Sequence, residues 1–341
     1  LGASAAAQAA TVYDQDGTKL DVYGRIAMGV AGGGPEYDSN DNYQDNGAEF
    51  VDVFSRLGLR MSQEVTSDLT AFGRLEWRFD GDENTTDGGF NEIRQSYLGL
   101  QSKQYGTFQA GNFDSFYNQF VSLPFDVYID RGLEFASHRK QSRGDSIGYY
   151  TPDLSGFTAF LQAKHYTARG AADPSADSEV AAQGGVRYAQ GPVTIGLGFV
   201  DDVARIDENN AGNGGGNDEM LYGLIGSYDV TDQFSLRLGY ETRDDNEVRG
   251  GGFDTVGLGG TYTTGPWAFA ADIYEVDPDG EESRTSWALG TYYKVSSNFD
   301  VFVELQQPDQ QSINVTLDGS DSEINTDGDD MYWLTGARYH F

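Results

Sequence analysis

Two sets of charged residues in this sequence could act on ions. Seven arginines fall on one face of the strands predicted near the two ends of the chain: Arg25, Arg56, Arg60, Arg74, Arg78, Arg94 and Arg338. Four acids lie in one aromatic-rich segment: Asp114, Asp126, Asp130 and Glu134. A basic surface opposite an acidic one sets up a field across a narrow water-filled gap, where low-dielectric walls strengthen it. The predicted chemistry is ion selection in a pore; the alternative is that the arginines only pair with nearby acids.

The acids belong to a segment, Gly111–Gln141, that lacks the period-two alternation of most of the chain. A connection of about thirty residues in a compact fold is usually functional or disordered, and the aromatic residues between Phe113 and Phe135 argue against disorder. We expect this segment to fold into the lumen of a barrel. Asp126, Asp130 and Glu134 would align if Phe125–Phe135 formed a helical turn.

The composition favours a membrane barrel. The 341 residues are 38% hydrophobic and 13% aromatic, yet the formal net charge is −32. Apolar residues outside a barrel and polar residues in its lumen and loops account for both values. No apolar run reaches the roughly eighteen residues that indicate a membrane helix. The sequence pI near 4.1 argues against nucleic acid as a partner, because phosphate binding needs a basic face.

Alternation of apolar and polar residues predicts sixteen strands. In the first of them, Leu20, Val22 and Ile26 share one face. The predicted strands are Leu20–Val30, Val51–Val65, Leu69–Phe79, Asn91–Gln101, Thr107–Gly111, Ser146–Thr151, Phe157–His165, Val180–Tyr188, Val193–Val200, Met220–Tyr228, Phe234–Thr242, Thr255–Thr263, Trp267–Glu275, Ser286–Lys294, Asp300–Gln306 and Met331–Phe341.

Short and long connections alternate between these strands. Short turns such as Thr66–Asp68 and Thr264–Pro266 are followed by long loops such as Gly81–Phe90 and Asp277–Ser283. This alternation is typical of outer-membrane barrels, which have tight periplasmic turns and long outward loops. The predicted fold is all-β: a 16-stranded antiparallel transmembrane β-barrel with a long third loop folded into the lumen.

The N-terminal residues 1–9 fit the remnant of a signal peptide. Ala7, Gln8 and Ala9 form the small-x-small pattern that precedes a signal-peptidase cleavage site. We therefore expect a mature start near Ala10, with residues 10–341 forming a single barrel domain beyond the inner membrane of a bacterium.

The last strand and several short motifs carry a family resemblance. The last strand ends on Tyr339 and a terminal Phe341. The other motifs are Asp21–Arg25, Ser55–Leu59, Ser67–Gly73 and Tyr105–Asn112. In these residues the chain resembles the general diffusion porins of the Gram-negative outer membrane, and the resemblance covers the mature chain from end to end.

This resemblance implies partners and site residues. It implies a homotrimer in contact with outer-membrane lipid and lipopolysaccharide. Tyr339 and Phe341 resemble the signal that the barrel-assembly machinery reads. In the family, a basic cluster faces acids of the third loop at the constriction, and Arg25, Arg56 and Arg94 match the positions of that cluster.

Two segments depart from the family pattern. Ile147–Tyr149 stands where the family often has a basic residue. Leu123–Asp126 is the nearest match to the family's Pro-Glu-Phe-Gly-Gly-Asp motif. The acids of the constriction are therefore less well defined by the resemblance than the arginines.

Signals for catalysis, cofactors and metals are weak. His138, His165 and His340 form no recognisable set with a nucleophile and an orienting group. The Asp-rich loops lack the twelve-residue spacing of a calcium loop, and the chain has no cysteine for a thiolate metal site. We expect no enzyme activity, no cofactor and no specific metal site, although acidic loops could bridge weakly to lipopolysaccharide through divalent cations.

The sequence as a whole predicts an outer-membrane porin that passes ions and small hydrophilic solutes by passive diffusion with mild cation selectivity. The first alternative is a solute-specific porin, such as a sugar porin, in which aromatic residues of the lumen loop form a stacking track: Phe113, Phe116, Tyr117, Phe120 and Tyr128. The second alternative is a secreted acidic β-protein.

Overall fold

The computed structural model describes residues 9–37, 42–83, 89–135, 143–166, 178–204, 216–309, 313–316, 323–326 and 330–341. Nearly all of its regular structure is strand. The helical elements in these ranges are η1 (Asn118–Ser122) and η2 (Leu123–Phe125), and Phe116 and Tyr117 lead helically into η1. No helix among the described residues is both long and apolar enough to cross a membrane. The strands are β1 (Ala10–Gln15), β2 (Thr18–Gly33), β3 (Glu49–Asp52), β4 (Arg56–Glu64), β5 (Leu69–Phe79), β6 (Phe90–Ser102), β7 (Gly106–Asp114), β8 (Arg143–Tyr150), β9 (Phe157–Tyr166), β10 (Glu179–Gln190), β11 (Val193–Asp202), β12 (Glu219–Asp229), β13 (Phe234–Arg243), β14 (Phe253–Thr264), β15 (Trp267–Pro278), β16 (Arg284–Lys294), β17 (Phe299–Gln307), β18 (Ile313–Thr316), β19 (Glu323–Thr326) and β20 (Tyr332–His340).

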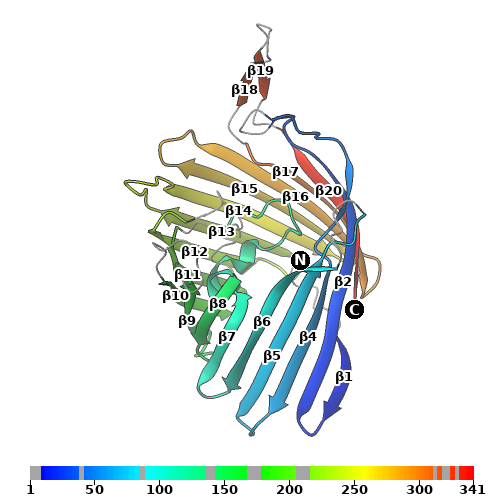
Figure 1. The fold of residues 1–341 in the computed structure, drawn as a ribbon, viewed down its shortest axis with the longest axis vertical. Helices are drawn as coiled ribbons and strands as arrows, with labels where there is room; N and C mark the ends of the chain where they lie inside the picture. The colour runs from blue at the N-terminus through cyan, green and yellow to red at the C-terminus, as the bar shows by residue number, and fades with distance from the viewer. Residues whose placement is uncertain are drawn as a thin grey trace.

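Sixteen of these strands close into an antiparallel barrel, as predicted (Figure 1). Each strand from β4 to β17 pairs with the next along the chain. Strand β20 pairs with β17 on one side and with β2 on the other, and β2 pairs with β4. Closure leaves no open wall edge, which a bilayer could not satisfy with hydrogen bonds.

The wall differs from the prediction at the N-terminal strand. Strand β1 was not predicted; it forms a hairpin with β2, where Ala10 lies opposite Val22. Phe341 exchanges backbone hydrogen bonds of 2.8 and 3.1 Å with Gly24 on the same edge of β2. Strand β1 therefore pairs with the edge of β2 beyond the point where β20 ends, so the two strands follow one another along that edge.

The predicted strand Val51–Val65 is interrupted. Its parts are β3 and β4, separated at Val53–Ser55, where Phe54 has a φ of +61°. The Ser55 amide donates to the Asp52 carboxylate at 2.8 Å, which holds the kink. Beyond the upper rim, the short strands β18 and β19 pair as a hairpin (Figure 1).

Side chains alternate between two environments along the wall. On β15, Trp267, Phe269 and Ile273 are exposed, whereas Ala270 and Tyr274 are buried. Exposed apolar side chains in a closed barrel face lipid, and the buried ones face the lumen. Exposed aromatic residues gather beside the short turns: Tyr105, Tyr149, Phe157, Tyr228, Trp267 and Tyr339. Such a girdle is typical of a membrane interface.

Candidate functional site: the charged lumen

Residues 115–135, here called the inner loop, are bonded to inward-facing side chains of the wall. The Ser115 hydroxyl donates to Gln183 at 2.6 Å, and the Phe116 amide donates to Gln162 at 2.8 Å. The Tyr117 hydroxyl donates to the Glu241 carboxylate at 2.5 Å. These bonds fix the first part of the inner loop against β9, β10 and β13, because each partner is a buried group whose bond would be costly to lose.

The far part of the inner loop is held by one carboxylate of β17. Glu304 is fully buried and accepts backbone N–H groups of Ile129, Asp130 and Arg131 at 2.5, 3.0 and 3.0 Å. The Tyr292 hydroxyl donates to the same carboxylate at 2.7 Å. Charge-assisted bonds of this kind are among the stronger hydrogen bonds in proteins, so Glu304 is a firm anchor.

Buried aromatic rings of the inner loop and glycines of the wall allow the inner loop to lie close to the wall. Phe125 and Phe135 contact each other and Tyr274 of β15 in a buried cluster. A Cβ at Gly257 would collide with the Phe135 ring, and one at Gly196 would collide with the loop backbone at Phe120. Glycine is therefore required at these inward positions by close packing, which sequence patterning did not reveal.

On the opposite wall, strand register gathers five of the seven arginines. Arg25, Arg56 and Arg78 lie opposite one another across β2, β4 and β5, and Arg60 lies opposite Arg74. Residues that face each other across antiparallel strands share one side of the sheet. We call the predicted arginines of β2, β4, β5 and β6 the arginine wall: Arg25, Arg56, Arg60, Arg74, Arg78 and Arg94.

Glu76 is the acid at the centre of this arginine wall. It is fully buried and forms ion pairs with Arg56, Arg74 and Arg94 at 3.3, 2.8 and 2.6 Å. Arg94 reaches it from a β-bulge, because Glu76 lies opposite Gln95 and the next residue lies opposite Ile93. The bulge turns two successive side chains of β6 inward, an arrangement common near functional sites.

Two of the predicted arginines are more deeply buried than the others. Arg25 is buried, and its Nε donates to the Phe54 carbonyl at 3.0 Å. Arg338 is also buried and pairs with Asp300 at 2.9 Å, beside His340. Arg338 therefore belongs to an ion pair of β17 and β20 rather than to the exposed surface of the arginine wall.

The four predicted acids have separate surroundings. Asp114 accepts a 2.8 Å hydrogen bond from Gln95 and lies 3.9 Å from Arg94, beside the arginine wall. Asp130 pairs with its neighbour Arg131 at 2.6 Å. Glu134 accepts two bonds of 3.0 Å from the guanidinium of Arg284 on β16. The partner residues Arg131 and Arg284 were not singled out from the sequence.

The helical alignment expected for Phe125–Phe135 is wrong. The short helix η2 ends at Phe125, and turns and bends follow up to Phe135. The three bonds to Glu304 replace the hydrogen bonds that a helix would make, so Asp126, Asp130 and Glu134 do not line up. The remainder of the predicted segment, residues 136–141, lies outside the described residues.

Asp126 is the inner-loop acid that interacts with the arginine wall. Burial raises the pKa of its carboxyl above the ordinary value, and the charge of Asp114 raises it further, whereas Arg94 and Arg56 oppose this. Within the described ranges Asp126 forms no ion pair. Of the four predicted acids, Asp114 lies beside Arg94, and Asp126 of the inner loop is the one whose pKa is influenced by both Arg94 and Arg56.

Comparison with known proteins identifies the family. The family described as "Gram-negative porin" matches residues 1–312. The chain belongs to the Gram-negative porins. Outer membrane protein YedS of Escherichia coli is 27% identical over 367 residues, which cover 98% of this chain and 95% of that protein. A monosaccharide porin of a Halomonas species is 25% identical over 355 residues, which cover 99% of this chain and 87% of that protein.

Solved structures agree on the fold. An anion-selective porin from Comamonas acidovorans superposes with a TM-score of 0.73 at 19% identity, covering 95% of this chain and all of that one. The protein is an outer-membrane channel for passive diffusion.

Most of the aromatic residues proposed as a stacking track are buried in this porin. Phe113, Phe116, Tyr117 and Tyr128 each expose 1% of their surface or less. Phe120 is partly buried and stacks on Phe160 of β9 at 5.1 Å between ring centroids. Four of the five rings are therefore buried between the inner loop and the wall, so the five cannot form a continuous stacking track.

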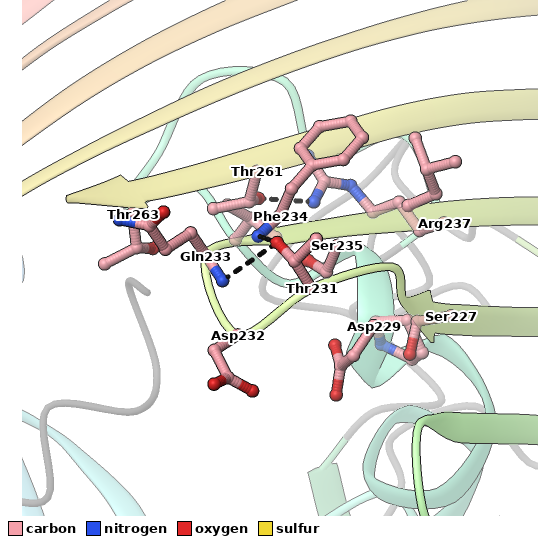
Figure 2. Close-up of a pocket in the computed structure, with 13 residues that line it drawn as sticks. Ser227, Asp229, Thr231, Asp232, Gln233, Phe234, Ser235, Arg237, Thr261 and Thr263 are labelled. Atoms are coloured by element: carbon pink, nitrogen blue, oxygen red, sulfur yellow. Dashed lines mark hydrogen bonds between the residues drawn. The ribbon is translucent and has the colours of Figure 1, made fainter.

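A polar cavity of about 500 Å³ lies between the inner loop and the turn joining β12 to β13 (Figure 2). Pro124 and Val127 line it from the loop side. The wall and the turn contribute hydroxyl and carboxylate side chains: Ser227, Asp229, Thr231, Asp232, Ser235, Thr261 and Thr263. Because that turn is short, this part of the porin's lumen lies at the periplasmic end.

Proposed function

We propose that the channel is narrowest between the inner loop and the arginine wall, and that this gap and the acidic outer loops together give mild cation selectivity. The observation that carries the proposal is the cluster of Arg56, Arg74 and Arg94 around Glu76, with Asp114 at 3.9 Å from Arg94. A barrel of sixteen strands encloses an aqueous channel unless something enters it. The inner loop is bonded to inward-facing groups on the half of the wall from β9 to β17.

The sign of selectivity depends on two opposing sets of charges. At the gap, Asp130 and Glu134 are neutralised by Arg131 and Arg284, so the arginine wall favours anions there. The two outer loops predicted from the sequence hold further acids: five in Gly33–Glu49 and seven in Asp309–Asp330, with no Lys or Arg in either. We propose that these outer acids enrich cations before the gap is reached. The Debye length falls from about 30 Å at 0.01 M salt to about 8 Å at 0.15 M, so the preference weakens as salt rises.

Two measurements in planar bilayers test this proposal. The reversal potential across a potassium chloride gradient should show cation preference at low salt that declines as salt rises. Removing residues Ser115–Glu134 should increase single-channel conductance in a barrel that still folds. Anion preference at low salt would show that the arginine wall dominates, and unchanged conductance in the folded deletion would place the inner loop outside the conducting path.

The proposal extends to processing and assembly. We propose that residues 1–9 are a signal-peptide remnant, that residues 10–341 form one domain, and that Tyr339 and Phe341 are read by the barrel-assembly machinery. A homotrimer in contact with lipopolysaccharide is the assembly we propose; the OmpT structure of Vibrio cholerae, a fold neighbour at 18% identity and a TM-score of 0.69, is a trimer form. Chemical crosslinking of the purified channel tests the subunit number. The proposed channel has no catalytic step and needs no cofactor.

A second candidate function is a preference for a polyhydroxylated solute. The hydroxyl-lined cavity beneath the inner loop favours it, in place of the aromatic track that is buried. The relative from Halomonas is described as a monosaccharide porin. Saturable reduction of the ion current by a neutral monosaccharide would support this candidate, and a linear dependence on sugar concentration would exclude it.

A further inference from the structure

Tyr23 occupies the centre of the arginine wall. In the register of β2, β4 and β5, the middle row consists of Tyr23, Gly58 and Glu76. The two flanking rows are Arg25, Arg56 and Arg78 on one side and Asp21, Arg60 and Arg74 on the other. An uncharged side chain with 2% of its surface exposed thus lies among the charges that face the lumen.

Gly58 allows Tyr23 to reach Glu76 across an entire strand. Adjacent strands are about 4.8 Å apart, so the backbones of Tyr23 and Glu76 are separated by about 10 Å. The Tyr23 hydroxyl nevertheless donates to Glu76 at 2.6 Å. Its ring passes over Gly58, where a Cβ would overlap the ring atoms. Any side chain at position 58 would displace the ring.

Tyr23 also holds two of the arginines. The Nε of Arg74 donates to the Tyr23 hydroxyl at 2.6 Å, so this hydroxyl both donates and accepts a hydrogen bond. The guanidinium carbons of Arg60 and Arg74 lie 4.2 and 5.2 Å from the centre of the Tyr23 ring. Cation–π contacts at these distances are attractive and keep both groups against the wall.

We infer that Tyr23, with Gly58 making room for it, is a positioning residue that fixes how far the charges of Arg60 and Arg74 extend into the lumen, and so tunes the ion selectivity and conductance of the channel. This inference rests on the proposed constriction. Without the ring or its hydroxyl, the two guanidinium groups lose a contact surface and an acceptor on the wall. They then extend toward water, closer to passing ions.

Two variants of the full-length channel test the inference in planar bilayers with a potassium chloride gradient. Tyr23→Phe removes the hydroxyl and keeps the ring, whereas Gly58→Ala displaces the ring itself. We expect the ratio of cation to anion permeability to fall about 1.5-fold in the first and about twofold in the second, the size expected when a charge moves an ångström or two toward an ion in water. Single-channel conductance should fall in the same order.

The matched control is Tyr240→Phe. Tyr240 faces outward, and its hydroxyl donates to Asp254 at 2.6 Å, so the variant loses one tyrosine–carboxylate bond away from the lumen. It should leave the permeability ratio unchanged. In an Arg74→Gln background, Tyr23→Phe should have a smaller effect, because residues that act through each other are not additive. A purely structural role for Tyr23 would lower barrel stability without this dependence on Arg74.

The outcomes separate the inference from the function on which it rests. If the permeability ratio changes in Arg94→Ala but not in folded Tyr23→Phe, the inference alone is overturned. If the permeability ratio changes in neither variant, the proposed constriction is overturned as well. If Gly58→Ala does not assemble, Tyr23→Phe still decides, because it removes a single oxygen and leaves the ring packing in place.

Discussion

The two halves of the inner wall use arginine differently. On the β2–β6 half, Arg56, Arg74 and Arg94 share Glu76, and their side chains expose 24, 25 and 19% of their surface. On the β10–β20 half, Arg237, Arg243 and Arg338 each pair with their own aspartate and expose only 4, 9 and 3%. Burial accounts for the difference between these two sets, since a charge removed from water needs a polar partner, whereas one that remains hydrated does not. Arg25, which is buried in the first half, donates to the Phe54 carbonyl.

This contrast indicates that the two sets of arginines have different roles. The paired arginines stabilise the wall, and Arg237 also supports the inner loop. It pairs with Asp272, donates to Thr261 at 2.7 Å and lies 5.7 Å from the Phe125 ring. The arginines around Glu76 carry excess positive charge toward the lumen. Variants in one half should therefore change stability, and variants in the other should change ion selectivity.

The largest effect is expected at the seam where the two halves meet. Deleting Phe341 removes its two backbone bonds to Gly24 and the ring that lies over that glycine. Because the membrane cannot satisfy an open strand edge, we expect strongly reduced insertion into the outer membrane. The amount of heat-modifiable barrel in outer-membrane fractions measures this, and a normal amount would contradict the expectation.

The next largest effect is expected for Arg237→Leu in the paired half. This variant leaves the buried carboxylate of Asp272 without its guanidinium, and breaking such a pair typically costs about 3–5 kcal/mol. The denaturant midpoint of the folded barrel should fall accordingly. The double variant Arg237→Leu with Asp272→Leu should recover much of the loss, and a single variant as stable as the parent would contradict the pairing argument.

A smaller effect is expected for Arg94→Ala in the arginine wall. Removing one positive charge near the ion path should raise the ratio of cation to anion permeability about twofold, because the Coulomb energy of a hydrated charge at 5–6 Å is below about 1 kcal/mol. Arg56→Ala should act in the same direction. Reversal potentials measure the change, while the denaturant midpoint should move less than in Arg237→Leu. A large loss of stability without altered selectivity would remove the distinction between the two halves.

The smallest effect is expected from pH. The pKa of Asp126 is raised by burial, so this carboxyl gains a proton at a higher pH than an ordinary aspartate as the solution is acidified. Loss of its negative charge should reduce cation preference. The test is the difference in reversal potential between the parent and Asp126→Asn as pH falls from neutral. The difference should shrink as the parent's Asp126 becomes protonated, and a constant difference down to the ordinary aspartate range would contradict the raised pKa.

The wall could be predicted from the sequence because lipid and water lie on its two sides. All sixteen predicted strands correspond to strands of the structure, and Leu69–Phe79 agrees at both ends. The break at Val53–Ser55 could not be predicted, because it depends on the Asp52 side chain and a left-handed Phe54 rather than on alternation. Strand β1 escaped prediction because its six residues are all exposed and present no apolar face.

The interior of the lumen was harder to predict. Arg94 was predicted to face inward with Arg25, Arg56 and Arg74, but the reason was incomplete. It faces inward because of a bulge in β6, which a period-two pattern does not contain. The partners of the inner loop lie far away in the sequence; Glu304 is 175 residues from Ile129. Such contacts depend on barrel closure and leave no local signature, so Glu134 could be named from the sequence but its pairing with Arg284 could not.

The anchor at Glu304 has a consequence for how this channel can diversify. Its three bonds to the inner loop involve backbone amides of residues 129–131, which every amino acid except proline possesses. These three hydrogen bonds therefore do not depend on which side chains stand at those positions. Ile129 is buried in the core, but Asp130 and Arg131 are only partly buried. Substitutions at these two positions can alter the charge and size of groups near the pore while the backbone bonds still hold the loop.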